Sequence, residues 1–384
     1  MIRWMTVWML AAALAWAPAL ASDNPERPRA RNAGVVIGTL SPGPLNAIVD
    51  VPGVAVGHAT LDQGDGSIRT GVTAILPHGG NLYQQRVPAA IHVANGFGKL
   101  LGVTQVRELG ELETPILLTG TLGVWQAADA MAGWLLAQPG MEQVRSINPV
   151  VGETNDGYLN DIRSRPLRPE HVTQALETAT TDNVQEGAVG AGAGTVAFGW
   201  KGGIGTSSRE VDAAGTRYTV GVLVQSNYGG DLVVAGVPVG RQLPDPASYL
   251  DAGEEPPVAD GDGSIMIVVA TDAPLDSRQL GRLASRAVVG LARTGASMSN
   301  GSGDYVIAFS SAPESRRGPG DAALTPATLS NDTMTPLFVA VAEATEEAIL
   351  NSMFRATTTR GHRGTVPALP LERVLPLVGE SAGR

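Results

Sequence analysis

A serine between two glycines is the residue most able to do chemistry in this sequence. Residues 300–304 read Asn-Gly-Ser-Gly-Asp, and the run Tyr305–Ser310 that follows is apolar and typical of a strand. The glycines allow strained backbone torsions and let another group approach Ser302 closely. A strand directly after the serine would hold its hydroxyl in a fixed position.

This arrangement suits a hydroxyl that attacks the carbonyl of its own preceding residue. Gly301 offers an unhindered carbonyl, and an N→O acyl shift followed by hydrolysis would free the α-amine of Ser302. Such an amine has a pKa near ~8 and can act as its own general base, as in N-terminal nucleophile enzymes. The competing interpretation is a plain turn before a strand, and the segment alone does not decide between the two.

The composition bounds the elements that position this serine. Hydrophobic residues make up 43% and charged residues 17% of the 384 residues, so one large domain or two ordinary ones can bury a core. The 48 glycines indicate tight turns and close backbone approaches rather than a helical bundle. A net charge of −10 without a long basic run argues against a nucleic-acid partner. The absence of cysteine excludes disulfides, thiolate nucleophiles and cysteine-based metal sites.

The first 21 residues have the pattern of a secretory signal peptide. Arg3 gives a positive start, Trp4–Ala17 is apolar apart from one threonine, and Ala19-Leu20-Ala21 is a small-x-small cleavage pattern. The alternative is an uncleaved anchor, since the apolar run is barely long enough to span a bilayer. We expect removal of residues 1–21, a periplasmic or secreted protein, and no membrane contact after cleavage. No later segment of the sequence is long and apolar enough to cross a membrane.

Short runs of β-branched residues and a few amphipathic stretches predict a mixed α/β chain. We expect strands at Val35–Leu40, Ile48–Val51, Val54–His58, Thr70–Leu76, Ala89–Ala94, Ile116–Thr119, Tyr218–Val224, Ile265–Ala270 and Tyr305–Ser310. We expect helices at Leu122–Leu136, Pro169–Ala179, Leu280–Leu291 and Leu337–Met353, and close-packed sheet and turns at Gly187–Gly205. The linker-like stretches 243–263 and 312–327 do not separate two self-sufficient halves, so residues 22–384 are predicted to form one layered domain.

Several stretches together resemble the self-processing family that includes L-aminopeptidase/D-Ala-esterase-amidase and the β-peptidyl aminopeptidases, peptidase family S58. They lie in the family order over nearly the whole chain after residue 21, and they are specific only as a set. The matching stretches are Val151–Asp161 (VGETNDGYLND), Phe198–Arg209 (FGWKGGIGTSSR), Gly221–Gly229 (GVLVQSNYG), Val268–Leu275 (VVATDAPL), Gly301–Asp304 (GSGD) and Ala344–Ala348 (ATEEA).

The resemblance implies a four-layer α/β/β/α sandwich of the N-terminal-nucleophile-hydrolase type. It implies cleavage between Gly301 and Ser302 into an α chain, 22–301, and a β chain, 302–384. It implies an aminopeptidase or amidase that uses Ser302 on short peptides, amides or β-peptides with a free N-terminus. It also implies no metal, no organic cofactor and a homo-oligomer of αβ units.

The resemblance assigns roles to three further residues of the larger fragment. Asn227 would donate its amide N–H to the developing oxyanion, although an asparagine can simply close a turn. Glu153 would bind the free amine of the substrate, although a glutamate in a polar loop is more ordinary. Tyr158 would donate its phenol to the same intermediate, or would merely pack.

The family also places a hydroxyl residue and a carboxylate two positions apart in the smaller fragment. Two stretches have that spacing. Thr345 and Glu347 offer a true glutamate, although the helical wheel puts Glu347 toward the polar side and a solvated face is the plain interpretation. Ser330 and Asp332 offer a true serine but an aspartate for the glutamate, and the competing interpretation of this pair is a helix N-cap. We expect the first pair to support the nucleophile, and the second is the alternative.

Other chemistry finds less support in the sequence. The five histidines, His58, His78, His92, His171 and His362, form no metal-spaced motif and none accompanies a serine motif. The glycine-rich stretch lacks the spacing of a phosphate-binding loop. An acyltransferase of the ornithine acetyltransferase type shares a similar fold and self-cleavage, but the signal peptide argues against that biosynthetic role. A self-processing binding protein without catalysis is a further alternative.

Overall fold

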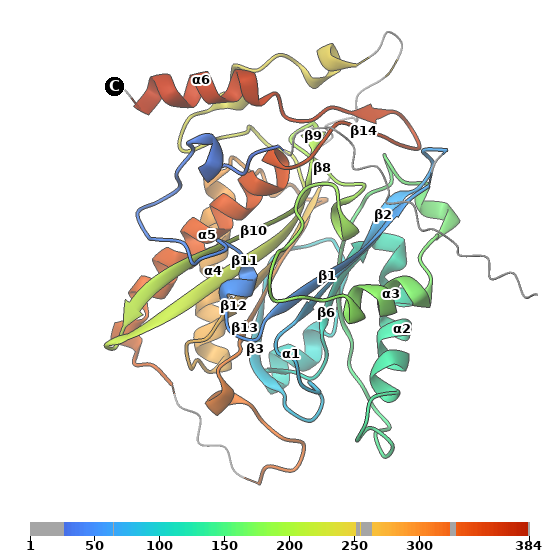
Figure 1. Cartoon of the computed structure of the whole chain (residues 1–384), viewed down its shortest axis with the longest axis vertical. Coiled ribbons are helices and arrows are strands. Elements are labelled where there is room, and N and C mark those ends of the chain that lie inside the picture. The colour runs from blue at the N-terminus through green and yellow to red at the C-terminus, as the bar shows by residue number, and fades with distance from the viewer. Residues whose placement is uncertain (1–26, 64, 251–253, 255–262, 323–327, 383–384) are drawn as a thin grey trace, which may run out of the picture.

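Two β-sheets stacked face to face form the centre of the chain, with helices on both outer sides (Figure 1). The computed structural model describes residues 27–63, 65–250, 254, 263–322 and 328–382. The predicted signal peptide, 1–21, therefore lies outside the described residues. The order of layers is helix, sheet, sheet, helix, which is the α/β/β/α sandwich expected from the sequence.

The first layer of strands is a six-stranded sheet in the order β10-β11-β12-β13-β3-β5. Its central pair, β12 and β13, is parallel, and its other pairs are antiparallel. The strands are β3 (Val87–Gly96), β5 (Glu111–Leu112), β10 (Gly203–Ala213), β11 (Thr216–Asn227), β12 (Ser264–Thr271) and β13 (Gly303–Ser310). The strand predicted after Ser302 is thus β13, and both of its long edges are paired.

The second layer of strands is a five-stranded sheet in the order β1-β2-β6-β7-β4. The strands are β1 (Ala55–Asp62), β2 (Arg69–Leu76), β4 (Leu100–Leu101), β6 (Ile116–Gly120) and β7 (Val150–Thr154). Two short ribbons, β8 (Val196–Ala197) with β9 (Trp200–Lys201) and β14 (Thr359–Arg360) with β15 (Thr365–Val366), lie outside both sheets.

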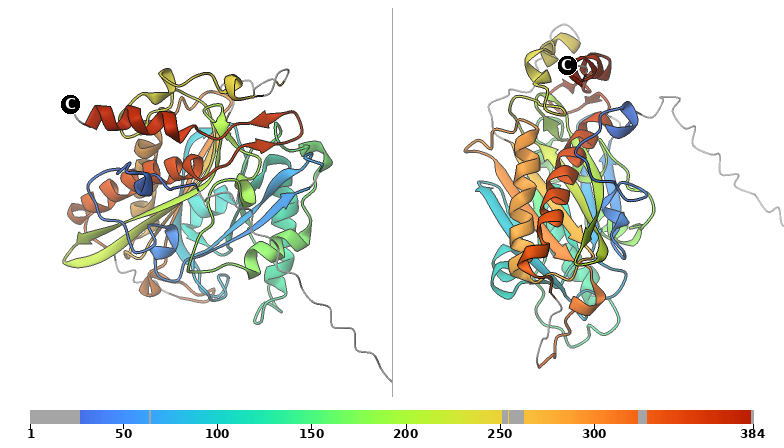
Figure 2. Two further views of the ribbon diagram at one scale, coloured as in Figure 1. Left: turned by 45° about the horizontal axis from the view of Figure 1, so that its top comes forward. Right: turned by 90° about the vertical axis from the view of Figure 1, so that its left-hand side faces the viewer.

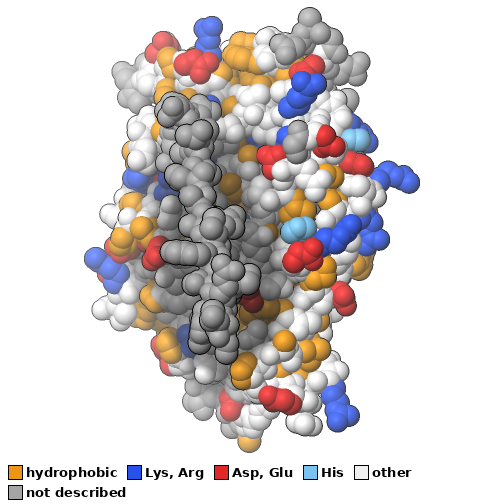
Figure 3. Space-filling model, turned by 45° about the vertical axis from the view of Figure 1, so that its right-hand side comes forward, with side chains coloured by type: hydrophobic (Ala, Val, Ile, Leu, Met, Phe, Trp, Pro, Cys, Tyr) orange, Lys and Arg blue, Asp and Glu red, His pale blue; other side chains and the backbone are white. Residues whose placement is uncertain are grey.

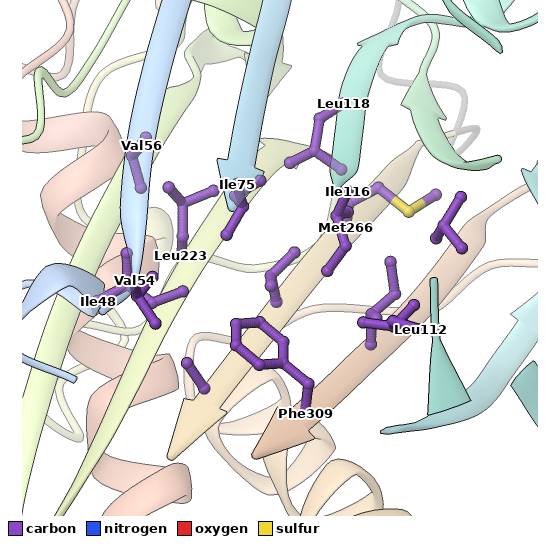
Figure 4. Packing of buried hydrophobic residues seen from close by; sticks show 14 of the residues in the cluster. Ile48, Val54, Val56, Ile75, Leu112, Ile116, Leu118, Leu223, Met266 and Phe309 are labelled. Atoms are coloured by element: carbon purple, nitrogen blue, oxygen red, sulfur yellow. The ribbon is translucent and has the colours of Figure 1, made fainter. Parts of the chain in front are cut away.

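Apolar side chains from both sheets fill the space between them (Figure 4). Ile75 and Leu118 of one sheet lie near Leu223, Met266 and Phe309 of the other, and all of these are buried. Burial of side chains of this size stabilises the fold by roughly 1.5–3 kcal/mol each. Alternate residues of the same strands point outward toward the helices, so the central strands are apolar on both faces and appear in the sequence as continuous hydrophobic runs.

The helices α4 (Ser277–Arg293) and α5 (Thr335–Phe354) cover the six-stranded sheet and stand side by side (Figure 2). The helices α2 (Val124–Leu136) and α3 (Pro169–Glu177) cover the five-stranded sheet. The shorter α1 (Val103–Leu109) lies near β3, and α6 (Leu371–Ala382) belongs to a separate apolar cluster with the end of α5.

Local sequence explains where the helices begin. The Asp276 carboxylate accepts the amide N–H of Gln279 at 2.7 Å, and the Gln279 side chain accepts that of Asp276 at 3.2 Å. This reciprocal capping box starts α4. Pro169 occupies the first turn of α3, as predicted, where its missing N–H leaves no helical hydrogen bond unmade.

Two predicted strands are wrong. Residues 35–40 belong to no sheet, because Glu343 of α5 accepts the backbone N–H groups of Thr39 and Leu40 at 3.0 and 3.1 Å. Residues Ile48–Asp50 form a 3-10 helix, η2, whose start is fixed by Asp50 accepting the N–H of Ala47 at 3.0 Å. In both segments a carboxylate replaces the neighbouring strand as the partner of the backbone. The other predicted strands and helices are confirmed, with boundary shifts of a few residues.

The surface carries charges of both signs. Lys and Arg side chains are interspersed with Asp and Glu on the face shown in Figure 3, with small apolar patches between them. Within the ranges that the structure describes, none of the helices has the length and apolar character needed to cross a bilayer.

Candidate active site

Ser302 lies one residue before β13 and is 2% exposed. Its hydroxyl donates a hydrogen bond of 2.6 Å to Oδ1 of Asp304, the second residue of the strand. The two side chains lie on the same side of the strand, since side chains two residues apart do so in extended backbone. The serine predicted to be the nucleophile is therefore buried and paired with a carboxylate.

The turn before Ser302 is held by an asparagine from the neighbouring strand. Nδ2 of Asn95, on β3, donates to the carbonyl oxygens of Ser299 at 2.6 Å, Asn300 at 3.3 Å and Ser302 at 2.7 Å. Within the described chain we find no hydrogen bond to the carbonyl of Gly301. The carbonyls on both sides of the Gly301–Ser302 peptide bond thus accept hydrogen bonds, whereas the Gly301 carbonyl itself accepts none from the described residues.

Asn227 is the last residue of β11 and lies at the same end of the sheet as the first residue of β13. In the strand register it lies opposite Ser264 of β12, which in turn lies opposite Gly303 of β13. Adjacent strands are about 4.8 Å apart, so Asn227 and Gly303 are separated by roughly two such spacings. The Oδ1 of Asn227 accepts the N–H of Val196 at 2.9 Å, which leaves the side-chain NH₂ as its donor group.

A buried lysine braces the loop that holds Asn227. Nζ of Lys201 donates to the carbonyls of Gly192, Thr195 and Gly202 at 2.9, 3.0 and 3.0 Å. Burial lowers the pKa of Lys201 to about 7, although the charge of Asp156 opposes that shift. Because Val196 follows Thr195 directly, Lys201 fixes the backbone that in turn fixes the Asn227 amide.

Glu153 brings a carboxylate from the second sheet to the same edge. It lies on β7 and is 2% exposed, and its Oε1 accepts the backbone N–H of Lys99 at 2.8 Å. A Cβ placed on Gly98 would lie 3.0 Å from that oxygen and 3.1 Å from Cα of Gly303. A side chain at position 98 would therefore crowd both groups, and the glycine lets this carboxylate lie close to the start of β13.

Glu153 is a buried carboxylate with a distant cation as its partner. Burial raises the pKa of this carboxyl, and the backbone N–H and the ammonium of Lys99 oppose the rise. The Lys99 ammonium lies 3.8 Å from Oε1 and is 43% exposed, so it is a loosely held partner. Tyr305, on β13, donates to the carbonyl of Gly98 at 2.7 Å and has its own pKa raised, first by burial and then by the charges of Glu153 and Asp304.

Tyr158 lies in the turn that follows β7 and is partly buried. Its backbone carbonyl accepts the N–H of Arg363 at 3.0 Å, and the next residue, Leu159, accepts that of His362 at 2.8 Å. The structure thus anchors this turn to the 359–366 ribbon. The role of the phenol stays a prediction.

Thr345 and Glu347 point to other partners than Ser302. The hydroxyl of Thr345 donates to the Val341 carbonyl of its own helix at 2.7 Å, and its Cβ packs against Gly290 of α4. Glu347 is fully buried and binds Arg209 at 2.6 Å, Arg31 at 3.0 Å and Asn46 at 2.6 Å. The face of α5 that carries Glu347 is therefore not solvated, because the segment 30–46 and β10 cover it.

The alternative pair, Ser330 and Asp332, is exposed and lies at the far end of the sheet. The neighbouring Leu329 donates its N–H to the carbonyl of Pro274, which follows the carboxyl end of β12, while Ser302 precedes β13 at the opposite end. The structure brings neither pair to Ser302 through a hydrogen bond between the described residues. The carboxylate that does bond to the Ser302 hydroxyl is Asp304.

Three residues of the site, Asp304, Asn95 and Lys201, were not predicted from the sequence. The feature that could have indicated Asp304 is its position two residues after the serine, at the start of a strand. Lys201 had a compositional signal, since it and Lys99 are the two lysines among 27 basic residues, and both lie at this site. Asn95 had none, because its contact with the serine turn spans more than 200 residues of sequence.

The two stacked sheets with outer helices, and a buried serine opening a central strand, are features of the N-terminal nucleophile hydrolase class. Comparison with known proteins extends this. The model of peptidase family S58 matches residues 46–366. A β-peptidyl aminopeptidase, BapA, of Sphingosinicella microcystinivorans is 43% identical over 367 residues, which cover 90% of each chain.

Solved structures agree with these sequence matches. The L-aminopeptidase D-Ala-esterase/amidase of Ochrobactrum anthropi, a variant of the Ntn hydrolase fold, has a TM-score of 0.84 at 36% identity and covers 93% of this chain and 99% of its own. A β-aminopeptidase of a Burkholderia species has a TM-score of 0.82 at 41% identity, with 92% and 98% covered. The chain belongs to peptidase family S58 and is a hydrolase of the aminopeptidase and amidase type.

No group of three or more His, Asp or Glu side chains able to hold a metal ion occurs in the part of the chain that the structure describes. The Ser302 hydroxyl bonds to the Asp304 carboxylate, and the Asn227 amide and the Glu153 carboxylate lie at the same end of the two sheets.

Proposed function

We propose that the protein cuts itself between Gly301 and Ser302 and then uses the α-amine of Ser302 as the base for its own hydroxyl. The observation that carries the proposal is the position of Ser302 at the start of a central strand, buried and bonded to Asp304 at 2.6 Å. The products would be an α chain, 22–301, and a β chain, 302–384. Both fragments contribute strands to one sheet, since β12 and β3 flank β13 on its two sides, and this pairing would hold them together.

In the hydrolytic reaction the Ser302 hydroxyl attacks the carbonyl of the substrate's first residue and passes its proton to the α-amine. The Asn227 NH₂ then donates to the oxyanion, a contribution that is often worth 10²–10³-fold in rate, roughly 3–4 kcal/mol. The protonated amine returns the proton to the leaving nitrogen, and water hydrolyses the acyl-serine. Tyr158 is proposed as a second donor to the same oxyanion.

Glu153 is proposed to select substrates with a free amine. Its buried carboxylate lies beside the start of β13, so a substrate ammonium bound there places the first carbonyl near Ser302. An ammonium that displaces Lys99 gives the carboxylate a closer cation than the present one at 3.8 Å. Short peptides and amides with an unblocked N-terminus are therefore the proposed substrates.

Among these substrates we propose that peptides with an N-terminal β-amino residue are accepted. The support is the name of the relatives, β-peptidyl aminopeptidases at 43% identity. A panel of p-nitroanilides with L-, D- and β-amino acyl groups tests this, and release of nitroaniline from the β-series is the expected result. Turnover of the L-series alone would contradict it.

The decisive experiment for self-processing is intact mass with N-terminal sequencing of the purified protein. We expect two fragments, the smaller beginning Ser-Gly-Asp-Tyr-Val. An active protein that remains one full-length chain would refute the mechanism.

Export is proposed from the pattern of residues 1–21. Fractionation of a bacterial host should find the protein outside the cytoplasm with Ser22 at its N-terminus, and an intact Met1 in the membrane fraction would support the anchor instead.

A homo-oligomer of αβ units is also proposed, and light scattering on the purified enzyme tests it.

A further inference from the structure

The self-cleavage step needs a base that the mature enzyme does not. After cleavage the α-amine of Ser302 can accept the proton of its hydroxyl. Before cleavage that nitrogen is part of the peptide bond to Gly301, and an amide nitrogen has no basic lone pair to accept a proton. The chain must therefore supply another acceptor for the first reaction only.

We propose that Asp304 is the general base of self-cleavage and that its role ends when the α-amine of Ser302 is released. This inference rests on the proposed self-processing before Ser302. Oδ1 of Asp304 lies 2.6 Å from the Ser302 hydroxyl oxygen, within the distance needed for direct proton transfer.

The surroundings of Asp304 fit a proton acceptor rather than a structural anchor. The residue is 2% exposed, and its Oδ2 has no hydrogen-bond partner among the described residues. Buried carboxylates with structural roles usually have their oxygens satisfied. Burial raises the pKa of this carboxyl, and the Ser302 hydroxyl and the backbone N–H of Ile265 oppose the rise without cancelling it, so the carboxylate is a stronger base than one in water.

The backbone is arranged for the same step. Asn95 donates hydrogen bonds to the carbonyls of Ser299, Asn300 and Ser302, and these bonds restrict the backbone of the turn on both sides of Gly301. Attack of that hydroxyl on the Gly301 carbonyl closes a five-membered ring. Anchored groups on both sides of the bond reduce the entropy that ring closure must overcome.

In the self-cleavage reaction, the Ser302 Oγ forms a bond to the carbonyl carbon of Gly301 while its proton moves to Asp304. The carbon–nitrogen bond then breaks, and Asp304 returns the proton to the departing nitrogen of Ser302. The result is an ester between Gly301 and the serine oxygen, together with a free amine. Water then hydrolyses the ester, which leaves the Gly301 carboxylate and the Ser302 hydroxyl.

The test follows self-cleavage of the full-length Asp304→Ala chain over time by intact mass. We expect the half-time to lengthen by roughly 10²–10⁴-fold, the usual contribution of a positioned base. Sodium formate should restore cleavage, because a small carboxylate fits the space left by the side chain, and sodium chloride at equal ionic strength should not. Turnover per cut chain, measured on formate-processed enzyme, should fall by less than about tenfold.

Asp272→Ala is the matched control. Asp272 follows β12 at the opposite end of the sheet, and it is a partly buried carboxyl whose pKa is likewise raised by burial. It should cut at the wild-type rate. A folded Asp304→Ala chain that formate does not restore would refute the role as a base and indicate a structural one.

Three further results would overturn the assignment. The first is an Asp304→Ala chain that cuts as fast as the wild type. The second is an uncut Asp304→Ala chain that hydroxylamine splits at residue 301, because the ester would then form without the carboxylate. The third is turnover per cut chain that falls as far as cleavage does. A wild-type chain that stays intact would instead refute the proposed self-processing itself.

Discussion

Two buried polar clusters on the same sheet differ in how completely their groups are paired. Around Arg209 of β10, the guanidinium binds Glu343 at 3.2 Å and Glu347 at 2.6 Å, and Glu347 receives further bonds from Arg31 and Asn46. Around Ser302, which directly precedes β13, Asp304 has one buried oxygen without a partner, and the Ser299 hydroxyl has none either, within the described residues.

The titration of the carboxyls reflects this difference. Burial alone would raise the pKa of Glu347, but Arg209, Arg31 and Asn46 outweigh it, and the pKa is lowered. The pKa of Asp304 is raised by burial, and no cation opposes the rise. A satisfied cluster fixes a structure, whereas an unsatisfied one keeps groups available for reaction. We therefore propose a structural role for the first cluster and a chemical role for the second.

Removing the reacting hydroxyl should have the largest effect. In Ser302→Ala no group can attack the Gly301 carbonyl or the substrate, so we expect no cleavage and no turnover. The fold should persist, because alanine is no larger than serine and the flanking glycines are unchanged. Gel analysis, a p-nitroanilide assay and circular dichroism measure the three properties. Retention of cleavage and activity would show that another residue is the nucleophile.

Removing the proposed oxyanion donor should have the next largest effect. We expect Asn227→Ala to lower kcat by roughly 10²–10³-fold, the usual scale for one such donor. The control is Asn148→Ala, which lies at the opposite end of β7 from Glu153. Among the described residues, the Asn148 side chain makes one long hydrogen bond, of 3.4 Å, to the Gly102 carbonyl. Equal rates for both variants would leave Asn227 as a residue that merely closes its strand.

Lys201 tests whether the loop behind Asn227 matters for catalysis. Lys201→Met keeps the side-chain volume but removes the hydrogen bonds to three carbonyls. We expect kcat to fall by roughly tenfold, which corresponds to about 1.4 kcal/mol of activation free energy. KM should change little, because the proposed site of the substrate amine is Glu153 and not Lys201. Steady-state kinetics separate the two constants, and a change confined to KM would contradict the positioning role.

The satisfied cluster should affect stability but not turnover. We expect Glu347→Gln to lower the free energy of unfolding by about 3–5 kcal/mol, since it leaves the charge of Arg209 partly unpaired in the interior. Activity per folded molecule should be unchanged, measured below the denaturation temperature. A loss of kcat without a loss of stability would instead support the catalytic role predicted for Glu347 from the family resemblance.

The same cluster gives a sign for the pH dependence. The pKa of Glu347 in the folded protein lies below its ordinary value of 4.5, so its stabilisation is present above that value and is lost as the pH falls through the folded pKa. The difference in stability between wild type and Glu347→Gln should therefore shrink below about pH 4.5. Chemical denaturation at several pH values measures it.

Sequence by itself determined the serine, the strand behind it and a layered α/β domain, and the order of the layers came from the family resemblance. The pattern Gly-Ser-Gly-Asp before an apolar run does not depend on distant residues, and long apolar runs identify strands buried on both faces. The failures at residues 35–40 and 48–51 have one cause. Carboxylates of Glu343 and Asp50 bind backbone that the local pattern assigned to strands, and one of them comes from 300 residues away.

Only the tertiary structure decided which polar residues share a site. A helical wheel cannot show that residues 30–46 cover α5, so it gave Glu347 a solvated face where the structure has a fully buried ion pair. Likewise, Asn95 reaches the serine turn because β3 pairs with β13 across more than 200 residues of chain. Local sequence fixes backbone preference and hydrophobic period, but the partner of a buried polar group depends on which strands and helices pack together.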